Sequence, residues 1–179
     1  MTIETLATQG RERIHTGLSG IDAHRLKVIR NASLRACFSR LEDTRHRLEF
    51  VARILGREYI CDAASRSVNA TWYALESTQG GIIWIADAPK DEVDYSRLVP
   101  TALRKVRMLL IVGGDSPCMH QAFDGVVPNI IPCDTMHEAL HHAYRYEADD
   151  VRVLYSPACP SEQSASDRAA SFCREVNEL

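Results

Sequence analysis

Apolar runs and amphipathic segments alternate along most of the chain, and this alternation predicts the fold. Short runs rich in β-branched and aromatic residues predict buried strands, and segments whose apolar residues recur every three or four positions predict helices. The predicted strands are 81–88, 106–114, 128–133 and 151–158, and the predicted helices are 67–78, 95–105, 116–123, 135–147 and 162–178. Strands that alternate with helices run parallel, with right-handed crossovers and helices on both faces. We therefore predict an α/β fold built on a Rossmann-like, doubly wound sheet.

A helix and a β-hairpin are predicted ahead of this layer. Between residues 21 and 41 the apolar positions recur at three- and four-residue steps, which is the period of a helix with one apolar face. Residues 48–63 contain two short alternating runs on either side of a Leu-Gly pair, which is typical of a hairpin. Residues 1–20 carry three glycines and no sustained period, so we expect a flexible leader there and one domain over residues 21–179.

Composition excludes several classes of protein. The chain of 179 residues has 45% hydrophobic and 25% charged residues, as expected for one ordinary globular domain. Its formal net charge of -3 provides no basic face for a polyanion, so we do not expect nucleic acid as a partner. It has neither a long apolar run nor a signal-like amino terminus, so we expect a cytoplasmic protein without membrane contact.

The cysteine and histidine residues could in principle bind a metal ion, but their spacing along the chain does not favour a metal site. The six cysteines are spread singly without a Cys-x-x-Cys pair, so we interpret them as free thiols that pack in the core. His137 and His141 are spaced one turn apart on one predicted helix, but no His-Glu-x-x-His motif accompanies them. We expect a solvated helix face at these histidines and no metal site.

Two nucleotide-binding motifs do not occur in the sequence. It has no phosphate-cradling loop of the form Gly-x-x-x-x-Gly-Lys-Ser/Thr, and no Gly-x-Gly-x-x-Gly fingerprint of dinucleotide sites. Gly113 and Gly114 follow a predicted strand, and without a lysine after them they are typical of a strand-to-helix turn. The sequence motifs therefore give no independent evidence for a phosphate-binding loop.

Four separated segments carry a resemblance to a known family. They are RLEDTRHRLEFV at 40–51, REYICDAASRSVNATWYALES at 57–77, VDYSRLVPTALRKVRMLLIVGGD at 93–115 and DTMHEALHHAYRYEADDVRVLYSPACPSEQ at 134–163. In this order and spacing they resemble the carboxy-terminal (third) domain of Mur ligases, most of all the D-glutamate-adding ones (MurD), over roughly residues 38–179. Ser-Pro-Ala-Cys at 156–159 is the most recognisable of the matching motifs.

The resemblance implies a fold and a set of ligands. In intact Mur ligases the first domain holds the UDP-sugar substrate, the central domain carries a P-loop, and the third closes over ATP and the incoming amino acid. Only the third domain is matched by this sequence. The resemblance therefore implies ATP as a ligand and a connection with peptidoglycan precursor synthesis.

Three residues match family positions that face the nucleotide. The resemblance implies that Arg47, next to His46, approaches the phosphates and that Asp62 contacts the ribose of ATP. The residues alone also fit a local role, in which Arg47 pairs with Glu49 or Asp43, His46 caps the hairpin, and Asp62 caps the loop after its strand. Both interpretations stay open at this point.

The positions that bind the amino acid in the family are only partly kept. Ser156 and Ser161 are retained, and the resemblance implies that Ser161 contacts the amino-acid carboxylate. The family lysine is replaced by Ala64, and Arg168 stands where the family has an aromatic residue. Arg66 offers a substitute cation, because a guanidinium binds a carboxylate through two hydrogen bonds. We take Ser156, Ser161 and Arg66 as candidate ligands of a substrate carboxylate.

Two functions follow from this mixture of retained and replaced residues. The first is a degenerate Mur-ligase-like module that binds a nucleotide, an amino acid or a protein partner, self-association included, without catalysis of its own. The second is the third domain of a split ATP-dependent amino-acid ligase, which acts in trans with a separate P-loop polypeptide. A fragment or decayed copy of a longer reading frame is a third alternative. No catalytic residue is predicted within the chain.

Overall fold

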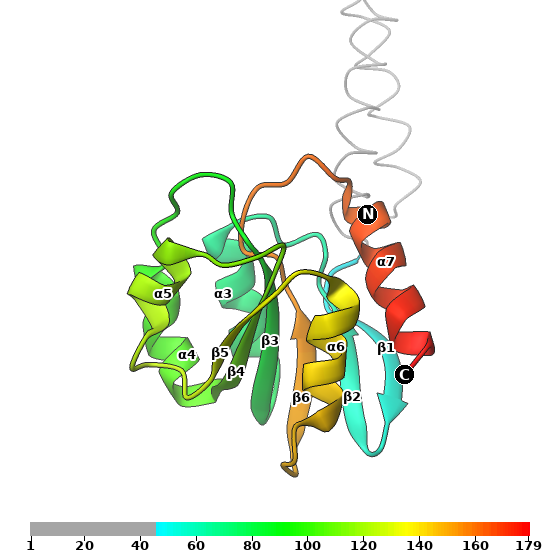
Figure 1. The fold of residues 1–179 in the computed structure, drawn as a ribbon. Coiled ribbons are helices and arrows are strands. Elements are labelled where there is room, and N and C mark those ends of the chain that lie inside the picture. Colours follow the sequence, from blue (N-terminus) through cyan, green and yellow to red (C-terminus); the bar gives the residue numbers. More distant parts are fainter. Residues whose placement is uncertain (1–45) are drawn as a thin grey trace, which may run out of the picture. The chain divides into compact units, whose positions relative to one another are not determined.

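The described part of the chain is a layered α/β structure. A computed structural model describes residues 46–179 (Figure 1). Its strands are β1 (Glu49–Ile54), β2 (Arg57–Cys61), β3 (Gly81–Asp87), β4 (Val106–Val112), β5 (Ile130–Cys133) and β6 (Val151–Tyr155). Its helices are α3 (Val68–Ser77), the short 3-10 helix η1 (Ser96–Leu98), α4 (Val99–Lys105), α5 (Pro117–Phe123), α6 (Met136–Arg145) and α7 (Ala165–Asn177). Each strand and helix predicted after residue 47 is found, whereas the predicted helix at 21–41 and the leader at 1–20 lie outside the described residues.

One six-stranded mixed sheet forms the centre of this structure. The strand order is β1-β2-β6-β3-β4-β5. Strands β2, β6, β3, β4 and β5 run parallel, and β1 is antiparallel to β2. The predicted α/β fold with a doubly wound sheet is confirmed. The predicted hairpin adds two strands to one edge of this same sheet.

The β1–β2 hairpin turns at two residues with left-handed backbone. Ile54 pairs with Arg57, which leaves Leu55 (φ 49°) and Gly56 (φ 81°) as the turn. Positive φ at both central residues matches the twist of a two-residue hairpin, and glycine adopts it without steric cost. The turn therefore sets the register that brings Cys61, at the end of β2, opposite the start of β1.

Successive residues of β3 supply two separate cores. Ile83 and Ile85 belong to the cluster that α6 and α7 cover, whereas Ile82, Trp84 and Ala86 belong to the cluster that α3, α4 and α5 cover. All five side chains are fully buried. Complete burial of a large apolar side chain stabilises the fold by about 1.5–3 kcal/mol. The period of two along β3 thus explains why helices pack on both faces of the sheet (Figure 1).

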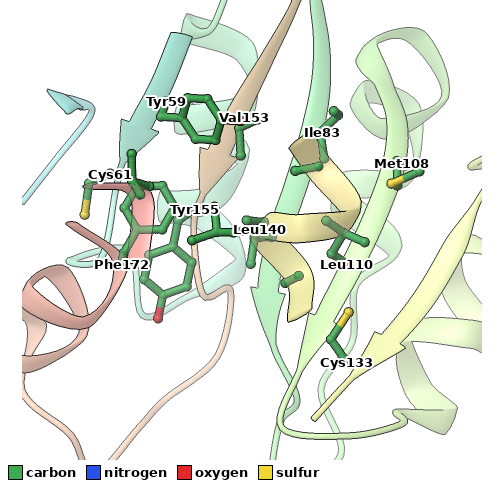
Figure 2. Packing of buried hydrophobic residues seen from close by; sticks show 14 of the residues in the cluster. Tyr59, Cys61, Ile83, Met108, Leu110, Cys133, Leu140, Val153, Tyr155 and Phe172 are labelled. Carbon is green, nitrogen blue, oxygen red and sulfur yellow. The ribbon is translucent and has the colours of Figure 1, made fainter. Parts of the chain in front are cut away.

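The cluster under α6 and α7 holds the carboxy-terminal helix against the sheet (Figure 2). Phe172 of α7 stacks on Tyr155 of β6, with the ring centroids 5.3 Å apart. Figure 2 shows Cys61 of β2 at the same end of the cluster as these two rings. Helix α7 is therefore fixed beside the strands β2 and β6.

Hydroxyl side chains begin four of the helices. Ser67, Ser116, Thr135 and Ser164 each accept a hydrogen bond from the backbone N–H three residues later, at the start of α3, α5, α6 and α7. Such a cap satisfies a helical N–H group and stabilises the helix by about 1 kcal/mol. Ser67 and Ser164 end the loops that follow β2 and β6, so these caps help to fix where the two loops lie.

Candidate functional site

The predicted site residues gather where β2 and β6 end. Parallel strands bring their carboxyl ends to one edge of the sheet, and ligands of open α/β sheets bind beyond that edge. Asp62 directly follows β2, Ser156 directly follows β6, and Asp87 ends β3, the next strand along the sheet. We call these residues, with the segments 46–48, 62–66 and 156–168, the carboxyl-end site.

A buried chain of hydrogen bonds ties β2 and β6 together. The Ser156 hydroxyl donates to Oδ2 of Asp62 at 2.8 Å, so it accepts from the Thr71 hydroxyl of α3, which is 2.9 Å away. The indole Nε1 of Trp84 donates to the Ser156 carbonyl at 2.9 Å. Ser156 and Thr71 are 0% exposed, and Asp62 is 2% exposed. Ser156 therefore links the end of β6 to Asp62 and to α3 inside the protein, and its hydroxyl is already hydrogen-bonded to Asp62.

Burial and nearby donors act on Asp62 in opposite directions. Burial raises the pKa of this carboxyl above its usual value, because the charged form loses its contact with water. Hydrogen bonds from Ser65, Ser156 and the backbone N–H of Leu48, together with the charge of Arg47, lower the pKa and offset part of that effect. The two nucleotide candidates Arg47 and Asp62 therefore interact electrostatically.

His46 contacts two other segments of the carboxyl-end site. Its carbonyl accepts from the N–H of Ala64 at 3.1 Å, and its Nε2 lies 3.4 Å from the Ser166 hydroxyl of α7. Its Nδ1 lies 3.1 Å from a carboxylate oxygen of Glu49, which is the acidic residue that the sequence also offered to Arg47. The predicted nucleotide candidates His46, Arg47 and Asp62 are thus brought to one place.

Left-handed backbone marks the border of the site. His46 (φ 59°), Leu48 (φ 49°) and Ala158 (φ 64°) all have positive φ. The N–H of Ala158 donates to the carbonyl of Ser65 at 3.2 Å, which joins the loop after β6 to the loop after β2. Non-glycine residues with positive φ are uncommon, and they concentrate at binding and catalytic sites, where surrounding contacts hold them in place.

The three substrate candidates do not share one surface. Arg66 is exposed, and its Nη2 donates to the backbone carbonyl of Ser161 at 3.0 Å. The Ser161 hydroxyl accepts from the N–H of Gln163 at 3.2 Å. Arg66 and Ser161 therefore contact each other at the surface, whereas Ser156 is fully buried.

A charged cluster that the sequence did not predict lies at the same ends of the strands. Arg168 of α7 is 3% exposed, and its Nη2 donates to the carbonyl of Ala63 at 2.6 Å. Its Nη1 lies 3.9 Å from Oδ2 of Asp87, and the Tyr155 hydroxyl donates to Asp87 at 3.0 Å. Among residues 46–179, Nε and Nη1 of Arg168 have no hydrogen-bond partner. A buried donor without a partner is costly, so this guanidinium is suited to an acceptor that residues 46–179 do not supply.

The protonation of this cluster follows from burial. Burial raises the pKa of Asp87, while the hydrogen bond from Tyr155 and the charge of Arg168 lower it. Burial and the charge of Asp87 raise the pKa of Tyr155, so its hydroxyl remains a neutral donor near pH 7. Asp87 and Arg168 thus form an ion pair without a direct hydrogen bond, and the neutral Tyr155 hydroxyl donates the hydrogen bond to Asp87.

The sequence did contain a signal for Arg168. This arginine lies on the same buried face of α7 as Ala169, Phe172 and Val176. A charged residue on an otherwise apolar helix face is rarely buried without a specific partner. That partner, Asp87, is far away in the sequence, so the pair could be recognised only in the folded chain.

The histidines on α6 do not complete a metal site. No group of three or more His, Cys, Asp or Glu side chains among residues 46–179 is placed to hold a metal ion. His137 and His141 contact each other edge-on, with ring centroids 4.4 Å apart, and His137 also pairs with Glu175 of α7. The pair of His137 with Glu175 links α6 to α7.

The N–H groups of Gly113 and Gly114 donate to the carbonyl of Cys133 at 2.9 and 3.2 Å, at the end of β4, so the predicted strand-to-helix turn is confirmed. No helix in the described part of the chain is long and apolar enough to cross a membrane.

Comparisons with known proteins identify one group of relatives. No protein-family model matches the chain. A UDP-N-acetylmuramoylalanine–D-glutamate ligase of Porphyromonas gingivalis (strain ATCC 33277) is 35% identical over 182 aligned positions, which cover 100% of this chain and 40% of that ligase. The ligases of the same name from Christiangramia forsetii and Salinibacter ruber are each 31% identical over 182 positions, and 41% and 40% of their lengths are covered.

The chain spans about 40% of the length of these curated relatives, and the matched part is their carboxy-terminal region. The match covers the whole chain, so it extends beyond residues 38–179, where the sequence motifs lie. Among solved structures, a domain from a UDP-N-acetylmuramate:L-alanyl-gamma-D-glutamyl-diaminopimelate ligase of Haemophilus ducreyi aligns with 73% of this chain and 99% of its own. That alignment has 11% identity and a TM-score of 0.49.

Proposed function

Because the chain is homologous over its whole length to the carboxy-terminal region of Mur ligases of the D-glutamate-adding type, we propose that it is a Mur-ligase-like module that binds an anionic ligand without catalysing ligation by itself. The homology connects the chain with peptidoglycan precursor synthesis. The proposed ligand is a nucleotide or an amino acid. A protein partner that presents a carboxylate or phosphate would use the same residues.

The observation that carries this proposal is the gathering of arginines at the carboxyl-end site. Arg47, Arg66 and Arg168 come from three separate segments of the chain. The charge of Arg47 lowers the pKa of the Asp62 carboxyl. Arg66 and Arg168 each donate a hydrogen bond to a backbone carbonyl of the site. A guanidinium suits planar, two-point recognition of phosphate or carboxylate. Arg47 and Arg66 are exposed and so are accessible to a ligand.

The absence of catalysis is proposed from the sequence of these 179 residues. They contain no Gly-x-x-x-x-Gly-Lys-Ser/Thr loop to cradle the phosphates of ATP. Ala64 stands at the family's lysine position and provides neither charge nor donor. A module with these replacements contributes part of a nucleotide contact, and we expect it to bind without turnover.

Calorimetric titration tests the proposal. The 179-residue chain is titrated with ATP, ADP and D-glutamate at millimolar concentrations, and we expect a binding heat with at least one of them. Arg47→Ala and Asp62→Asn should each weaken that binding by at least about tenfold, which corresponds to about 1.4 kcal/mol. Arg53→Ala is the matched control, because it removes the same charge from β1 near the turn, where Arg53 pairs with Glu58.

Two results would contradict the proposal. One is a folded protein that gives no heat with any of the three ligands at these concentrations. The other is an unchanged affinity in both Arg47→Ala and Asp62→Asn, because the carboxyl-end site would then not be the place of binding.

The split-ligase hypothesis remains the second candidate, and one observation favours it. The three relatives described above are named as ligases, and this chain corresponds to only about 40% of their length. If the chain acts in trans, mixing it with a separate P-loop polypeptide should produce phosphate release from ATP that neither shows alone. Binding of ligand without such release favours the non-catalytic module.

A further inference from the structure

A serine, a histidine and a glutamate form a row of contacts at the start of α7. Ser166 is the second residue of α7, and its hydroxyl lies 3.4 Å from Nε2 of His46. Nδ1 of the same imidazole lies 3.1 Å from Oε2 of Glu49, the first residue of β1. Ser166 and His46 are 120 residues apart in the sequence, so this row exists only in the folded chain.

His46 is held in place from two sides. Its N–H donates to Oε1 of Glu49 at 2.7 Å, so both carboxylate oxygens of Glu49 contact this one residue. Its carbonyl accepts from the N–H of Ala64 at 3.1 Å. Its backbone is left-handed (φ 59°), a conformation that non-glycine residues keep where surrounding contacts hold them, often at functional sites. The imidazole is therefore fixed before any substrate arrives.

The carboxylate of Glu49 decides which nitrogen of the imidazole carries the proton. A carboxylate accepts hydrogen bonds and donates none, so the neutral ring is assigned its proton on Nδ1. Nε2 then has a free lone pair, and the Ser166 hydroxyl is the donor across the contact of 3.4 Å. A hydroxyl that donates to an imidazole, which a carboxylate in turn orients, is the arrangement that activates serine as a nucleophile.

We propose that Ser166 is a nucleophile for small carboxylic esters, with His46 as its general base and Glu49 as the residue that positions His46. The Ser166 oxygen attacks the carbonyl carbon of the ester, and its proton passes to Nε2 of His46. The bond to the alcohol oxygen then breaks, the alcohol leaves with that proton, and an acyl-serine remains.

Water completes the reaction. It attacks the acyl carbon while His46 accepts its proton, and the bond to the Ser166 oxygen breaks as that proton returns to the serine. In total, one ester and one water give one carboxylic acid and one alcohol. This hydrolysis consumes no ATP and is separate from ligation.

The start of α7 suits the charge that develops in this reaction. The first N–H groups of a helix have no carbonyl partner within it, and in α7 these include the N–H groups of Ala165 and Ser166. An oxyanion that forms on an ester beside Ser166 therefore lies at the positive end of the helix dipole. The acidic residue of this turn, Asp167, accepts from the Ser164 hydroxyl at 2.7 Å, so its carboxylate contacts the cap residue.

Exposure of the row indicates the kind of ester. Ser166 is exposed, and the His46 side chain is 24% exposed, so a small ester reaches both without any opening of the core. The serine lies at the surface, so we expect little selectivity for the acyl group. The contact of 3.4 Å is long, but catalytic hydrogen bonds often shorten only when substrate binds.

Hydrolysis of 4-nitrophenyl acetate tests the proposal, because this ester has a good leaving group that is coloured. The 179-residue chain is mixed with the ester, 4-nitrophenol release is followed, and the acetyl group is then located by peptide mass spectrometry. We expect the acetyl group on Ser166, and a rate that falls at least about tenfold in Ser166→Ala and in His46→Ala. Ser171→Ala is the matched control, because it removes the same hydroxyl from α7 outside the carboxyl-end site.

Two further measurements separate a catalytic role from a structural one. Added imidazole should restore part of the acetylation of Ser166 in His46→Ala, which a defect in folding would not allow. Glu49→Gln should lower kcat and leave KM unchanged, because Glu49 contacts His46 rather than the ester. His141→Ala is the matched control for His46→Ala, since it removes an exposed imidazole from α6.

Three results would overturn the proposal. The first is a folded wild type that releases 4-nitrophenol no faster than Ser166→Ala. The second is acetylation of other side chains only. The third is acetylation of Ser166 at an unchanged rate in His46→Ala without imidazole, because the serine would then react without its base. These reactions contain no ATP, ADP or D-glutamate, so their outcome leaves the proposed ligand binding unaffected.

Discussion

Arg57 and Arg168 lie at opposite ends of β2, and they use their guanidinium groups differently. Arg57 begins β2, and its Nη1 and Nη2 donate to the carbonyls of Ala143 and Tyr146 at 2.5 Å each, at the end of α6. The last carbonyls of a helix lack partners within it, so this arginine caps α6. Arg168 donates to a single carbonyl, that of Ala63.

The two arginines differ in how many of their guanidinium N–H donors have a hydrogen-bond acceptor among the described residues. Nε of each arginine is buried without a hydrogen-bond partner among the described residues, but Arg57 uses both of its terminal nitrogens. Nη1 of Arg168 has no hydrogen-bond partner there, and its neighbour Asp87 is 3.9 Å away and bonded to Tyr155. The satisfied terminal nitrogens of Arg57 indicate a structural role, whereas the Nη1 of Arg168, which no described residue satisfies, is the reason for including Arg168 in the proposed binding site.

The largest effect is expected from removing the counter-charge of Arg168. Asp87→Ala leaves a buried cation without its carboxylate, and breaking a buried pair in this way costs about 3–5 kcal/mol. Because the Asp87 side chain is 20% exposed, we expect about 3 kcal/mol, at the lower end of that range. Denaturant unfolding of the purified variant measures this loss directly.

A double-variant cycle shows whether Asp87 and Arg168 act as a pair. The loss in Asp87→Ala/Arg168→Met should fall short of the sum of the two single losses by about 1 kcal/mol or more. Strictly additive losses would mean that the two charges are not coupled at 3.9 Å, and the contrast with Arg57 would then lose its basis.

A smaller effect is expected at the other end of β2. Arg57→Met removes charged hydrogen bonds to the end of α6 and should lower the free energy of unfolding by about 2 kcal/mol. Arg145→Met is the control, because it removes the same charge from an exposed side chain of the same helix and should change stability by no more than about 0.5 kcal/mol.

The ligand affinity of the Arg57→Met variant tests the same difference between the two ends of β2. Arg57→Met should leave any affinity of the carboxyl-end site unchanged, because Arg57 begins β2 and the site lies beyond the other end of that strand. A fall in affinity that matches the loss in Arg47→Ala would contradict the separation of a structural end from a binding end.

The fold could be predicted from the sequence because its signals are local. The apolar run of β3, with inward and outward side chains at alternate positions, and the Leu55-Gly56 turn each depend on neighbouring residues. Ser67 and Ser164 begin helices by contacts within three residues. Such patterns are visible without any knowledge of which strands become neighbours.

The site could be predicted only in part, because its contacts are not local. Asp62 and Ser156 were named as candidates from family positions, but their direct hydrogen bond depends on β2 pairing with β6. The sequence marks Arg168 only as a departure from an aromatic position of the family. Its contact with Asp87 requires the order of strands in the sheet and the docking of α7, neither of which a sequence pattern specifies.

The smallest effect is expected from removing the exposed charge of His120, which compares a surface ion pair with the buried arginines. His120 of α5 lies 2.9 Å from Asp115 through Nε2 and 2.9 Å from Asp124 through Nδ1. Only the imidazolium can donate from both ring nitrogens, and these carboxylates raise the pKa of His120. The side chain is 32% exposed, so the contribution of this charge should stay under about 1 kcal/mol.

The sign of its pH dependence follows from the raised pKa. The stabilisation is complete below the unfolded pKa of His120, near 6.5, and is lost as the pH rises through the higher folded value. The difference in unfolding free energy between wild type and His120→Gln should therefore be larger at about pH 5.5 than at about pH 8.5. A difference that is constant across this range, or that grows with pH, would show that His120 does not carry its charge between the two aspartates. The comparison of the buried Arg168 with the exposed His120 would then rest on their hydrogen bonds and not on their charges.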